Sequence, residues 1–338
     1  MKAAVFHSAD RPLEVEEVPD PTPGPTDLVV EVRCCGICGS DLHAASQPGG
    51  LPKGCVMGHE FSGEVVEVGG EVRGKFRPGD RVTAVPGIGC GSCSDCLSGD
   101  VMHCAALEIT GLGQLPGAYA QYVRVGSNES VRLPESVDFP LGALVEPLAV
   151  GLHAVKAAAL EPGQDVLVMG AGPIGLAVIL WSRFLGARHI LVSEPANGRR
   201  AMATALGATA VAEGTDAAAE ILADRPGGGA DIIFECVGKP GLLAQSVKVA
   251  APRSKVVVAG LCMRPDNFVP GVAVVKELRL EFVLAYHKAD FQLTLDMLDA
   301  GRIDPWPMVT DRIDLAGLPQ VFEALKNPAD QCKVLVEF

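Results

Sequence analysis

The first part of the chain contains short stretches in which apolar and polar residues alternate, and proline or glycine separates one stretch from the next. Such alternation predicts β-strands, because successive side chains of a strand point to opposite faces. Several short strands at close spacing are typical of a barrel-like β domain. The expected strands cover residues 3–6, 13–15, 28–32, 61–68, 81–83 and 119–125.

From residue 165 onward the pattern changes to continuous apolar strands that alternate with helices. Asp165–Met169 is such a strand, and a glycine-rich turn and an apolar helix at 176–185 follow it. Regular alternation of strand and helix predicts a parallel, doubly wound sheet. Further strands are expected at 189–193, 231–236 and 255–260, a connecting helix at 141–160 and a closing strand at 333–336. The fold class is therefore α/β, with a β-barrel domain and a doubly wound domain.

The turn after Asp165–Met169 carries a GxGxxG string formed by Gly170, Gly172 and Gly175, with Pro173 and Ile174 between the last two. Alone, the string is a weak signal, and an ordinary strand–turn–helix is the alternative. Between a strand and a helix it indicates a dinucleotide site, because the glycines let a pyrophosphate approach the unpaired N–H groups of the helix N-terminus.

Glu194 ends the next expected strand, about 20 residues beyond the fingerprint, where an acid contacts the adenosine ribose. Its charge would repel the 2′-phosphate of NADP, so the sequence favours NAD. Arg199 and Arg200 follow directly and leave open the alternative that either pairs with that phosphate.

Four cysteines lie within fifteen residues, at Cys90, Cys93, Cys96 and Cys104. Four thiolates can complete a tetrahedron around zinc, which leaves no position for a substrate and makes the site structural. A nucleic-acid-binding zinc ribbon is the rival interpretation. The neighbouring Asp95, Asp100 and Glu108, without a basic cluster, argue against it.

A second set of candidate ligands is spread along the chain. Cys38 and His59 offer a thiolate and an imidazole, which are ligands that zinc takes, and a catalytic zinc keeps one position open. Glu146 is a lone acid in the apolar run 139–152. A buried carboxylate needs a cation or hydrogen bonds to compensate it, which makes Glu146 the candidate third ligand.

Three segments, Cys38-Gly-Ser-Asp, Gly58-His-Glu and Glu146-Pro-Leu-Ala-Val, resemble the zinc-containing medium-chain alcohol dehydrogenases, in particular the sorbitol and butanediol dehydrogenase branch. The resemblance extends over essentially the whole chain. It implies a GroES-like catalytic domain at 1–150 with a structural-zinc lobe at about 86–106, an NAD-binding Rossmann domain at 151–285, and a return to the catalytic domain at 286–338. It also implies a catalytic zinc on Cys38, His59 and Glu146.

The same resemblance assigns roles around the metal and the cofactor. Ser40 corresponds to the hydroxyl that contacts the substrate oxygen, and His43 to the outer member of a proton relay, with a solvated surface histidine as the alternative. Asp41 would orient a ligating imidazole, and Glu60 would be an exchanging zinc ligand or a base. The nicotinamide would lie at Val237, Gly238, Gly260 and Leu261.

Departures from the family bear on the substrate. Ala44-Ala45 and Phe282-Val283 stand where aromatic or polar residues are usual, which disfavours a highly hydroxylated polyol, whereas Arg312 would keep one polar contact. We therefore expect a zinc-dependent NAD dehydrogenase of secondary alcohols or vicinal diols. Sorbitol-type or threonine-type dehydrogenases remain alternatives, as do a zinc-free quinone or enoyl reductase and a non-catalytic, crystallin-like protein.

Composition narrows the remaining function classes. The net charge of −13 disfavours nucleic-acid partners, since that affinity depends on Lys and Arg. The sequence has no signal-peptide pattern and no apolar run of membrane-spanning length, so we expect a cytoplasmic protein. We also expect a homo-oligomer, a tetramer or a dimer. Eleven cysteines in this setting indicate metal ligands or reduced thiols. Outside the ligand sets, buried thiols are expected at Cys34, Cys35, Cys55, Cys236, Cys262 and Cys332.

Overall fold

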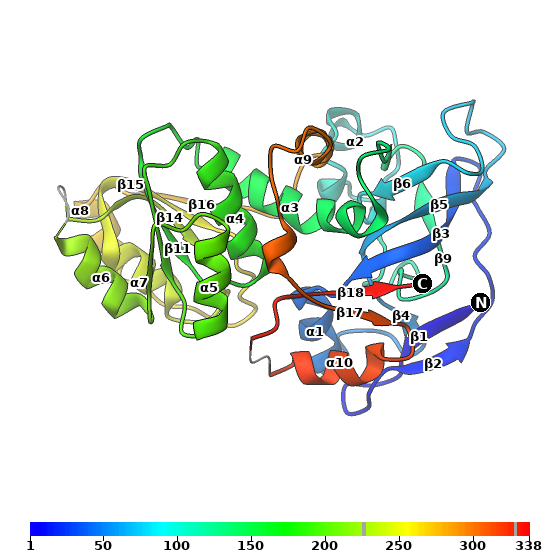
Figure 1. The fold of residues 1–338 in the computed structure, drawn as a ribbon, viewed down its shortest axis with the longest axis horizontal. Helices are drawn as coiled ribbons and strands as arrows, with labels where there is room; N and C mark the ends of the chain where they lie inside the picture. The colour runs from blue at the N-terminus through cyan, green and yellow to red at the C-terminus, as the bar shows by residue number, and fades with distance from the viewer. Residues whose placement is uncertain (225–227, 328–329) are drawn as a thin grey trace. The chain divides into compact units, whose positions relative to one another are not determined.

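The computed structural model describes residues 1–224, 228–327 and 330–338 (Figure 1). The chain forms two compact units. Unit 1 comprises Met1–Glu146, Tyr286–Gly301 and Val309–Phe338, and unit 2 comprises Pro147–Ala285 and Arg302–Met308. The expected boundary at residue 150 thus lies slightly inside unit 2, within helix α3 (Phe139–Ala157), and residues 302–308 belong to unit 2 and not to the C-terminal return.

Unit 1 is built on mainly antiparallel sheets, in which β17 and β18 pair in parallel. A seven-stranded sheet has the order β10-β6-β5-β3-β18-β17, with β9 also paired to β3, and a three-stranded sheet has the order β2-β1-β4. The bounds are β1 Lys2–Phe6, β2 Glu14–Glu17, β3 Asp27–Gly36, β4 Cys55–Val56, β5 Glu60–Val68, β6 Arg81–Ala84, β7 Gly87–Ile88, β8 Glu108–Ile109, β9 Tyr122–Gly126, β10 Ser130–Arg132, β17 Val309–Asp314 and β18 Lys333–Glu337.

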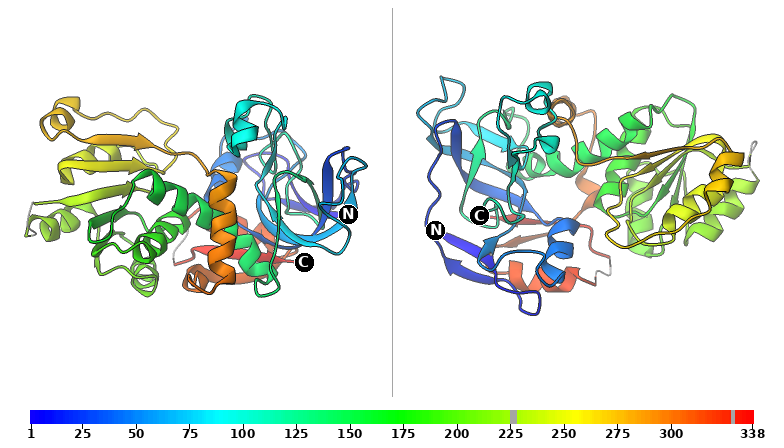
Figure 2. Two further views of the ribbon diagram at one scale, coloured as in Figure 1. Left: turned by 90° about the horizontal axis from the view of Figure 1, so that it is seen from above. Right: turned by 180° about the vertical axis from the view of Figure 1, so that it is seen from behind.

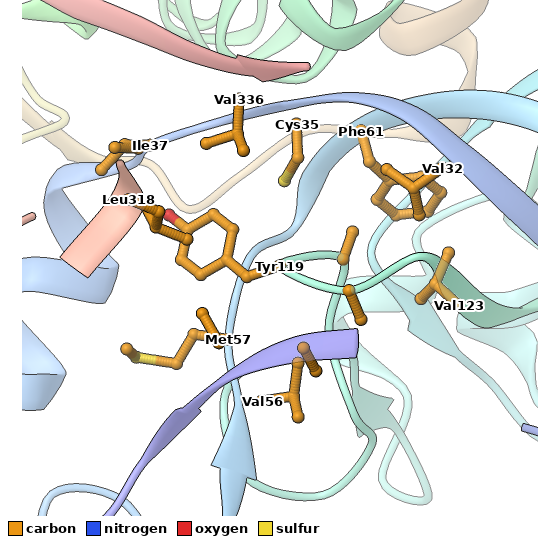
Figure 3. Packing of buried hydrophobic residues seen from close by; sticks show 14 of the residues in the cluster. Val32, Cys35, Ile37, Val56, Met57, Phe61, Tyr119, Val123, Leu318 and Val336 are labelled. Carbon is orange, nitrogen blue, oxygen red and sulfur yellow. The ribbon is translucent and has the colours of Figure 1, made fainter. Parts of the chain in front are cut away.

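The core of unit 1 lies between its sheets, and Figure 3 shows part of it. β3 is buried along most of its length, and its pairing with β5, β9 and β18 places it inside the sheet rather than at an edge. The last strand, β18, aligns Leu335 with Gly36 and thus ties the end of the chain to its beginning. The remaining elements are α1 Gly39–Ser46, α2 Ser94–Ser98, η1 Val101–His103, α9 Lys288–Asp299 and α10 Leu318–Leu325.

Unit 2 is a six-stranded parallel sheet with the order β13-β12-β11-β14-β15-β16. Helices α4 and α5 cover one face, and α6 and α7 cover the other (Figure 2). The strand order reverses between β11 and β14, which is the kind of switch point where doubly wound sheets bind ligands. The bounds are β11 Asp165–Met169, α4 Pro173–Phe184, β12 His189–Ser193, α5 Asn197–Ala205, β13 Ala210–Ala212, α6 Thr215–Ala223, β14 Ala230–Glu235, α7 Leu242–Val249, β15 Ala250–Val258, α8 Pro270–Val275, β16 Arg279–Phe282 and η2 Trp306–Met308.

Most expected elements are present, and the differences have simple causes. Strands β11 and β12 have the predicted bounds, whereas β13, β16 and β17 were not predicted because they are short or mostly polar. Of the six other cysteines, Cys34, Cys35, Cys55 and Cys332 are buried, but Cys236 and Cys262 are partly exposed. Within the described residues, no helix has the length and apolar character to cross a membrane.

Candidate active site and metal centres

Cys38 lies between the end of β3 and the start of helix α1. Cys38 has extended backbone angles and is the N-cap residue, and its N–H donates to Asp41 Oδ2 over 3.3 Å. An acceptor in the first turn satisfies an N–H that the helix leaves unpaired. The turn therefore fixes Cys38, Ser40 and Asp41 relative to one another, with the thiol at the helix N-terminus.

His59 approaches this turn from the segment before β5. Ser40 Oγ donates to Cys38 Sγ over 3.1 Å and lies 3.3 Å from His59 Nε2. Gly58 precedes the histidine with a φ of +94°, a conformation that glycine adopts without strain. Cys38, Ser40 and His59, which the sequence placed at the catalytic metal, thus converge in the structure.

Asp41 lies behind the histidine and is fully buried. Its Oδ1 is 3.2 Å from His59 Nδ1, and its Oδ2 accepts a hydrogen bond of 2.7 Å from the hydroxyl of Tyr119. Burial alone would lower the pKa of His59, but the charges of Asp41 and Cys38 outweigh it and raise that pKa well above its usual range. The carboxylate of Asp41 and the thiol of Cys38 thus make the surroundings of His59 negative.

Glu146, on α3, is 7% exposed and accepts a hydrogen bond of 3.0 Å from the hydroxyl of Tyr286. Burial raises the pKa of Glu146 to about 7, although the nearby charge of His59 opposes the shift. The ligand atoms of Cys38, His59 and Glu146 do not all lie within 4.8 Å of one another. The donor types are those of a catalytic zinc, so the three residues fit the metal in kind, with wider spacing than in the four-cysteine lobe.

Glu60 has a partner that the sequence did not predict. Both of its carboxylate oxygens lie within 2.6 Å of Lys333 Nζ, and both side chains are buried. The carboxylate occupies space left by Gly36, where a Cβ atom would lie 2.1 Å from Glu60 Oε2. Glu60 is thus engaged in an ion pair, and its expected role as a zinc ligand or base stays a prediction.

His43 lies on the exposed side of α1, with its Nε2 2.6 Å from Gln47 Nε2. Solvent exposure fits both alternatives, the outer end of a proton relay and an ordinary surface histidine.

The four cysteines of the predicted structural site come together in the lobe formed by α2 and η1. Their sulfur atoms all lie within 4.8 Å of one another, and Cys90 Sγ is 4.0 Å from Cys96 Sγ. A tetrahedral zinc with Zn–S bonds of 2.3 Å requires sulfur separations of about 3.8 Å. Backbone N–H groups of Cys90, Cys93 and Cys96 donate to sulfurs of the set, which favours thiolates. The lobe therefore fits a structural zinc.

Over the described residues one other group meets the same distance criterion, formed by His7, Glu14 and Glu16 at the β1–β2 hairpin. His7 Nε2 lies 2.6 Å from Glu16 Oε1, and Arg11 forms an ion pair with Glu14. The arginine already supplies a cation there, so we assign this group no metal.

In unit 2 the predicted fingerprint forms the turn between β11 and α4. Gly170 has a φ of +91°, and a Cβ atom at Gly175 would lie 2.0 Å from Gly170 O. Pro173 is the first helical residue and Ile174 follows it. The missing Cβ of Gly172 faces open space, with no atom within 4 Å. The turn is thus tight on its inner side and open at Gly172, as a pyrophosphate site needs.

Glu194 is attached to this turn. Its Oε2 accepts from Ala171 N over 2.8 Å, its Oε1 accepts from Ala196 N over 2.9 Å, and it is 5% exposed. Arg200 donates to the backbone oxygens of Glu194 and Pro195. Contact of Glu194 with a ribose stays a prediction, and so does any contact of Arg199 or Arg200 with a phosphate.

Glu235, at the end of β14, holds the next loop in the same way. Its Oε1 accepts from Val237 N over 2.7 Å and from Gly238 N over 2.9 Å. A Cβ atom at Gly260 would lie 2.2 Å from Gly238 N, so the two expected nicotinamide loops touch, and Leu261 is 62% exposed beside them. The two loops therefore lie together beyond the carboxyl ends of β14 and β15, and they contain the predicted residues Val237, Gly238, Gly260 and Leu261.

Comparison with known proteins gives a consistent result. The family described as Alcohol dehydrogenase GroES-like domain matches residues 24–135, and the family described as Zinc-binding dehydrogenase matches residues 173–300. The chain belongs to the zinc-dependent medium-chain alcohol dehydrogenases, in the sorbitol and butanediol dehydrogenase branch.

Individual relatives of this dehydrogenase cover almost its full length. The (R,R)-butanediol dehydrogenase of Bacillus subtilis is 33% identical over 351 residues, covering 99% of both chains, and its crystal structure matches with a TM-score of 0.89 over 100% of this chain and 99% of the other. The sorbitol dehydrogenase of Bacillus subtilis is 30% identical over 345 residues, covering 99% of this chain and 97% of the relative. A zinc-binding dehydrogenase of Sinorhizobium meliloti, solved with NADP, is 32% identical with a TM-score of 0.87, covering 100% and 99%.

The expected fold class, a GroES-like barrel with a Rossmann domain, is confirmed. Sequence reasoning missed three site residues of this dehydrogenase, Tyr119, Tyr286 and Lys333, because each contacts a residue far away in the chain. Some signals were present. Lys333 opens an apolar strand, and Tyr119 lies among small residues that permit close packing.

Proposed function

We propose that this dehydrogenase transfers a hydride between NAD and a secondary alcohol or a vicinal diol, with ketone reduction as the reverse reaction. The observation that carries the proposal is the convergence of Cys38, Ser40 and His59, with Asp41 behind the imidazole. The relatives named sorbitol dehydrogenase, (R,R)-butanediol dehydrogenase and D-xylulose reductase act on compounds of this class.

Each residue of the candidate site has a separate proposed role. Cys38, His59 and Glu146 would hold a zinc ion that acts as a Lewis acid on the alcohol oxygen, while the nicotinamide takes the hydride. Ser40 Oγ, within 3.3 Å of both the thiol and the imidazole, is placed to hydrogen-bond the alcohol oxygen and would pass its proton on, with His43 as the proposed outer member of the relay. Asp41 Oδ1, 3.2 Å from His59 Nδ1, would orient the ring so that Nε2 faces Ser40 and remains available to a metal.

Polyols and threonine-like amino alcohols remain alternative substrates, because Ala44-Ala45 and Phe282-Val283 do not determine how polar the substrate pocket is. Ala45 is 2% exposed in the core, and Phe282 is 67% exposed on the edge strand β16. Arg312, the expected polar contact, forms an ion pair with Glu337 over 3.3 Å. The substrate must therefore be identified by assay.

Two measurements test the proposal together. Elemental analysis should find two zinc ions per chain, and an NAD-linked assay should find turnover with the stereoisomers of 2,3-butanediol, at a higher kcat/KM than with sorbitol, xylitol or threonine. A chelator should remove the activity. Activity that persists without zinc and reduces quinones or enones with NADPH would support the zinc-free alternative instead.

NAD is proposed as the cofactor because Glu194 places a buried carboxylate at the end of β12. A relative solved with NADP means that both cofactors must be assayed. A cytoplasmic location is proposed because the eleven cysteines, all within the described residues, form no disulfide bond there, as is usual in a reducing compartment.

We further propose a homo-oligomer that associates through the edge of the unit 2 sheet. β16 is an edge strand, and Val274, Val275 and Phe282 on α8 and β16 are 73%, 85% and 67% exposed. An exposed apolar edge can pair with its own copy about a two-fold axis. Light scattering should give a dimer or tetramer for the wild type and a smaller species for Phe282→Asp, and a monomeric wild type would refute this assignment.

A further inference from the structure

The chain has three tyrosines, and one of them, Tyr119, is buried in the core of unit 1 below the candidate metal site. Figure 3 shows its ring among Met57, Cys35 and Leu318, with the hydroxyl oxygen at the end of the side chain. The ring packs edge-on against Phe322 with a centroid distance of 6.4 Å. A tyrosine that only filled this space could be a phenylalanine, so the hydroxyl needs an explanation of its own.

The backbone around Tyr119 is fixed to the segment that carries His59. Ala118 N donates to Gly58 O over 2.8 Å, and Tyr119 N donates to Met57 O over 2.8 Å. The ring lies against Gly58, where a Cβ atom would be 2.5 Å from Tyr119 Cδ1. Tyr119 therefore touches the residue directly before His59.

The hydroxyl of Tyr119 is connected to the imidazole ring of His59 through the carboxylate of Asp41. It donates to Asp41 Oδ2 over 2.7 Å, and Asp41 Oδ1 lies 3.2 Å from His59 Nδ1. Asp41 and Tyr119 both have 0% exposure. A carboxylate this deeply buried depends on its hydrogen bonds, and the hydroxyl of Tyr119 gives a shorter one than the N–H of Cys38 at 3.3 Å.

We propose that Tyr119 is a positioning residue for His59: its hydroxyl holds Asp41 in the orientation that keeps Nδ1 of His59 turned inward and Nε2 turned towards Cys38. This inference rests on the proposed function, because it assumes that Cys38 and His59 hold a metal. Groups that orient a ligating histidine through its second nitrogen typically change metal affinity about 10- to 100-fold when they are lost.

Tyr119→Phe tests the proposal because it removes the hydroxyl and keeps the ring. Tyr122→Phe is the matched control, since Tyr122 is a half-buried tyrosine on β9, and the contacts of Asp41 described above come from Tyr119, Cys38 and His59. Zinc transfer to a chromophoric chelator is followed for each protein, with zinc content and unfolding temperature measured in parallel. We expect Tyr119→Phe to lower the affinity for one zinc ion about 10- to 100-fold and to leave the lobe zinc in place. Its activity should return in excess zinc. Tyr122→Phe should behave as the wild type.

A double-mutant cycle with Asp41→Asn shows whether Tyr119 acts through Asp41. If it does, Tyr119→Phe adds little to the effect of Asp41→Asn, because residues that work through one contact are not additive. Zinc affinity of Tyr119→Phe within twofold of the wild type, or multiplicative effects in the double variant, would overturn the proposal.

The wild-type protein separates this failure from a failure of the proposed function. A wild type that binds only the lobe zinc and lacks alcohol dehydrogenase activity refutes the function, and the role of Tyr119 with it. A wild type with two zinc ions and full activity, whose Tyr119→Phe variant is unchanged, refutes only the role of Tyr119.

Discussion

Lys333 and Glu60 form a buried ion pair in unit 1, with Lys333 Nζ 2.5 Å from Glu60 Oε2 and side-chain exposures of 0% and 1%. Lys333 Nζ also donates to Ile37 O over 3.0 Å. Ile37 directly precedes the candidate ligand Cys38, and Glu60 directly follows His59. One ammonium group from the last strand therefore fixes the flanks of both ligands.

Lys333→Met should destabilise unit 1 by about 3–5 kcal/mol, because it leaves the Glu60 carboxylate buried without a counter-charge. Denaturant unfolding followed by circular dichroism measures the change. The two tryptophans of the chain, Trp181 and Trp306, both belong to unit 2. Their fluorescence therefore provides an internal control, whose unfolding midpoint should change much less.

The double variant Lys333→Met/Glu60→Gln should recover much of this stability, since it removes both charges. If Lys333→Met alone unfolded at the wild-type denaturant concentration, the ion pair would contribute nothing to the stability of unit 1.

The two candidate zinc sites should respond differently to loss of one thiol. Cys93→Ser should lose the lobe zinc and lower the unfolding temperature, because a structural zinc contributes folding free energy, about 10 kcal/mol or more in zinc-finger peptides. Cys38→Ser should abolish turnover and leave the unfolding temperature nearly unchanged. Calorimetry and zinc analysis of both variants check this expectation. An unchanged unfolding temperature for Cys93→Ser would contradict the structural assignment.

Cofactor choice should depend on Glu194. Glu194→Ser removes a charge that repels the 2′-phosphate, so the NADP-to-NAD ratio of kcat/KM should rise by about one to three orders of magnitude, with about 1.4 kcal/mol for each tenfold step. The substitution also removes the acceptor of Ala171 N and Ala196 N. Glu194→Gln therefore serves as a control that removes the charge and keeps an acceptor.

Both variants should shift the ratio in the same direction if charge decides the preference. A wild type that uses both cofactors equally well, or a ratio unchanged in Glu194→Gln, would show that Glu194 does not read the ribose.

Unit 2 should show a pH dependence that originates at Glu235. Burial raises the pKa of Glu235, although the N–H groups of Gly238 and Val237 oppose the shift. A carboxyl group with a raised pKa binds its proton more tightly in the folded state. Its stabilising contribution is complete below the unfolded pKa of about 4.3 and is lost as the pH rises through the folded pKa.

Glu235→Gln keeps an oxygen acceptor for the two N–H groups and cannot ionise. The wild type should therefore lose stability relative to Glu235→Gln as the pH rises above about 4.3. Tryptophan fluorescence reports on unfolding in unit 2 and measures this difference at each pH. Parallel pH profiles for the two proteins would contradict the expected role.

The sequence predicted those features that depend on residues close together in the chain. Cys90 to Cys104 and the turn from Gly170 to Gly175 are local motifs, and their spacing alone fixes which groups can meet. Strands β11 and β12 were predicted because they are continuously apolar.

The parts that sequence did not predict depend on pairing between distant segments. Tyr119 meets Asp41 across 78 positions, and Lys333 meets Glu60 across 273. No periodicity connects such residues, because the register of β18 against β3 decides which side chains become neighbours. The apolar pattern at Ala44-Ala45 and Phe282-Val283 leaves the substrate as a prediction for the same reason, since a sequence pattern does not say what the side chains face.

The position of β18 also sets the order in which unit 1 can be completed on the ribosome. Glu60 and Gly36 are synthesised early, but the ammonium group that compensates Glu60 comes from the last strand of the chain, after all 139 residues from Pro147 to Ala285 have been made. Until then the nascent chain carries a carboxylate without its counter-ion and β3 without one of its neighbours. Unit 2 contains its whole sheet and can fold first. A chain that stops before Lys333 would therefore have an intact cofactor-binding unit and an unfinished catalytic one.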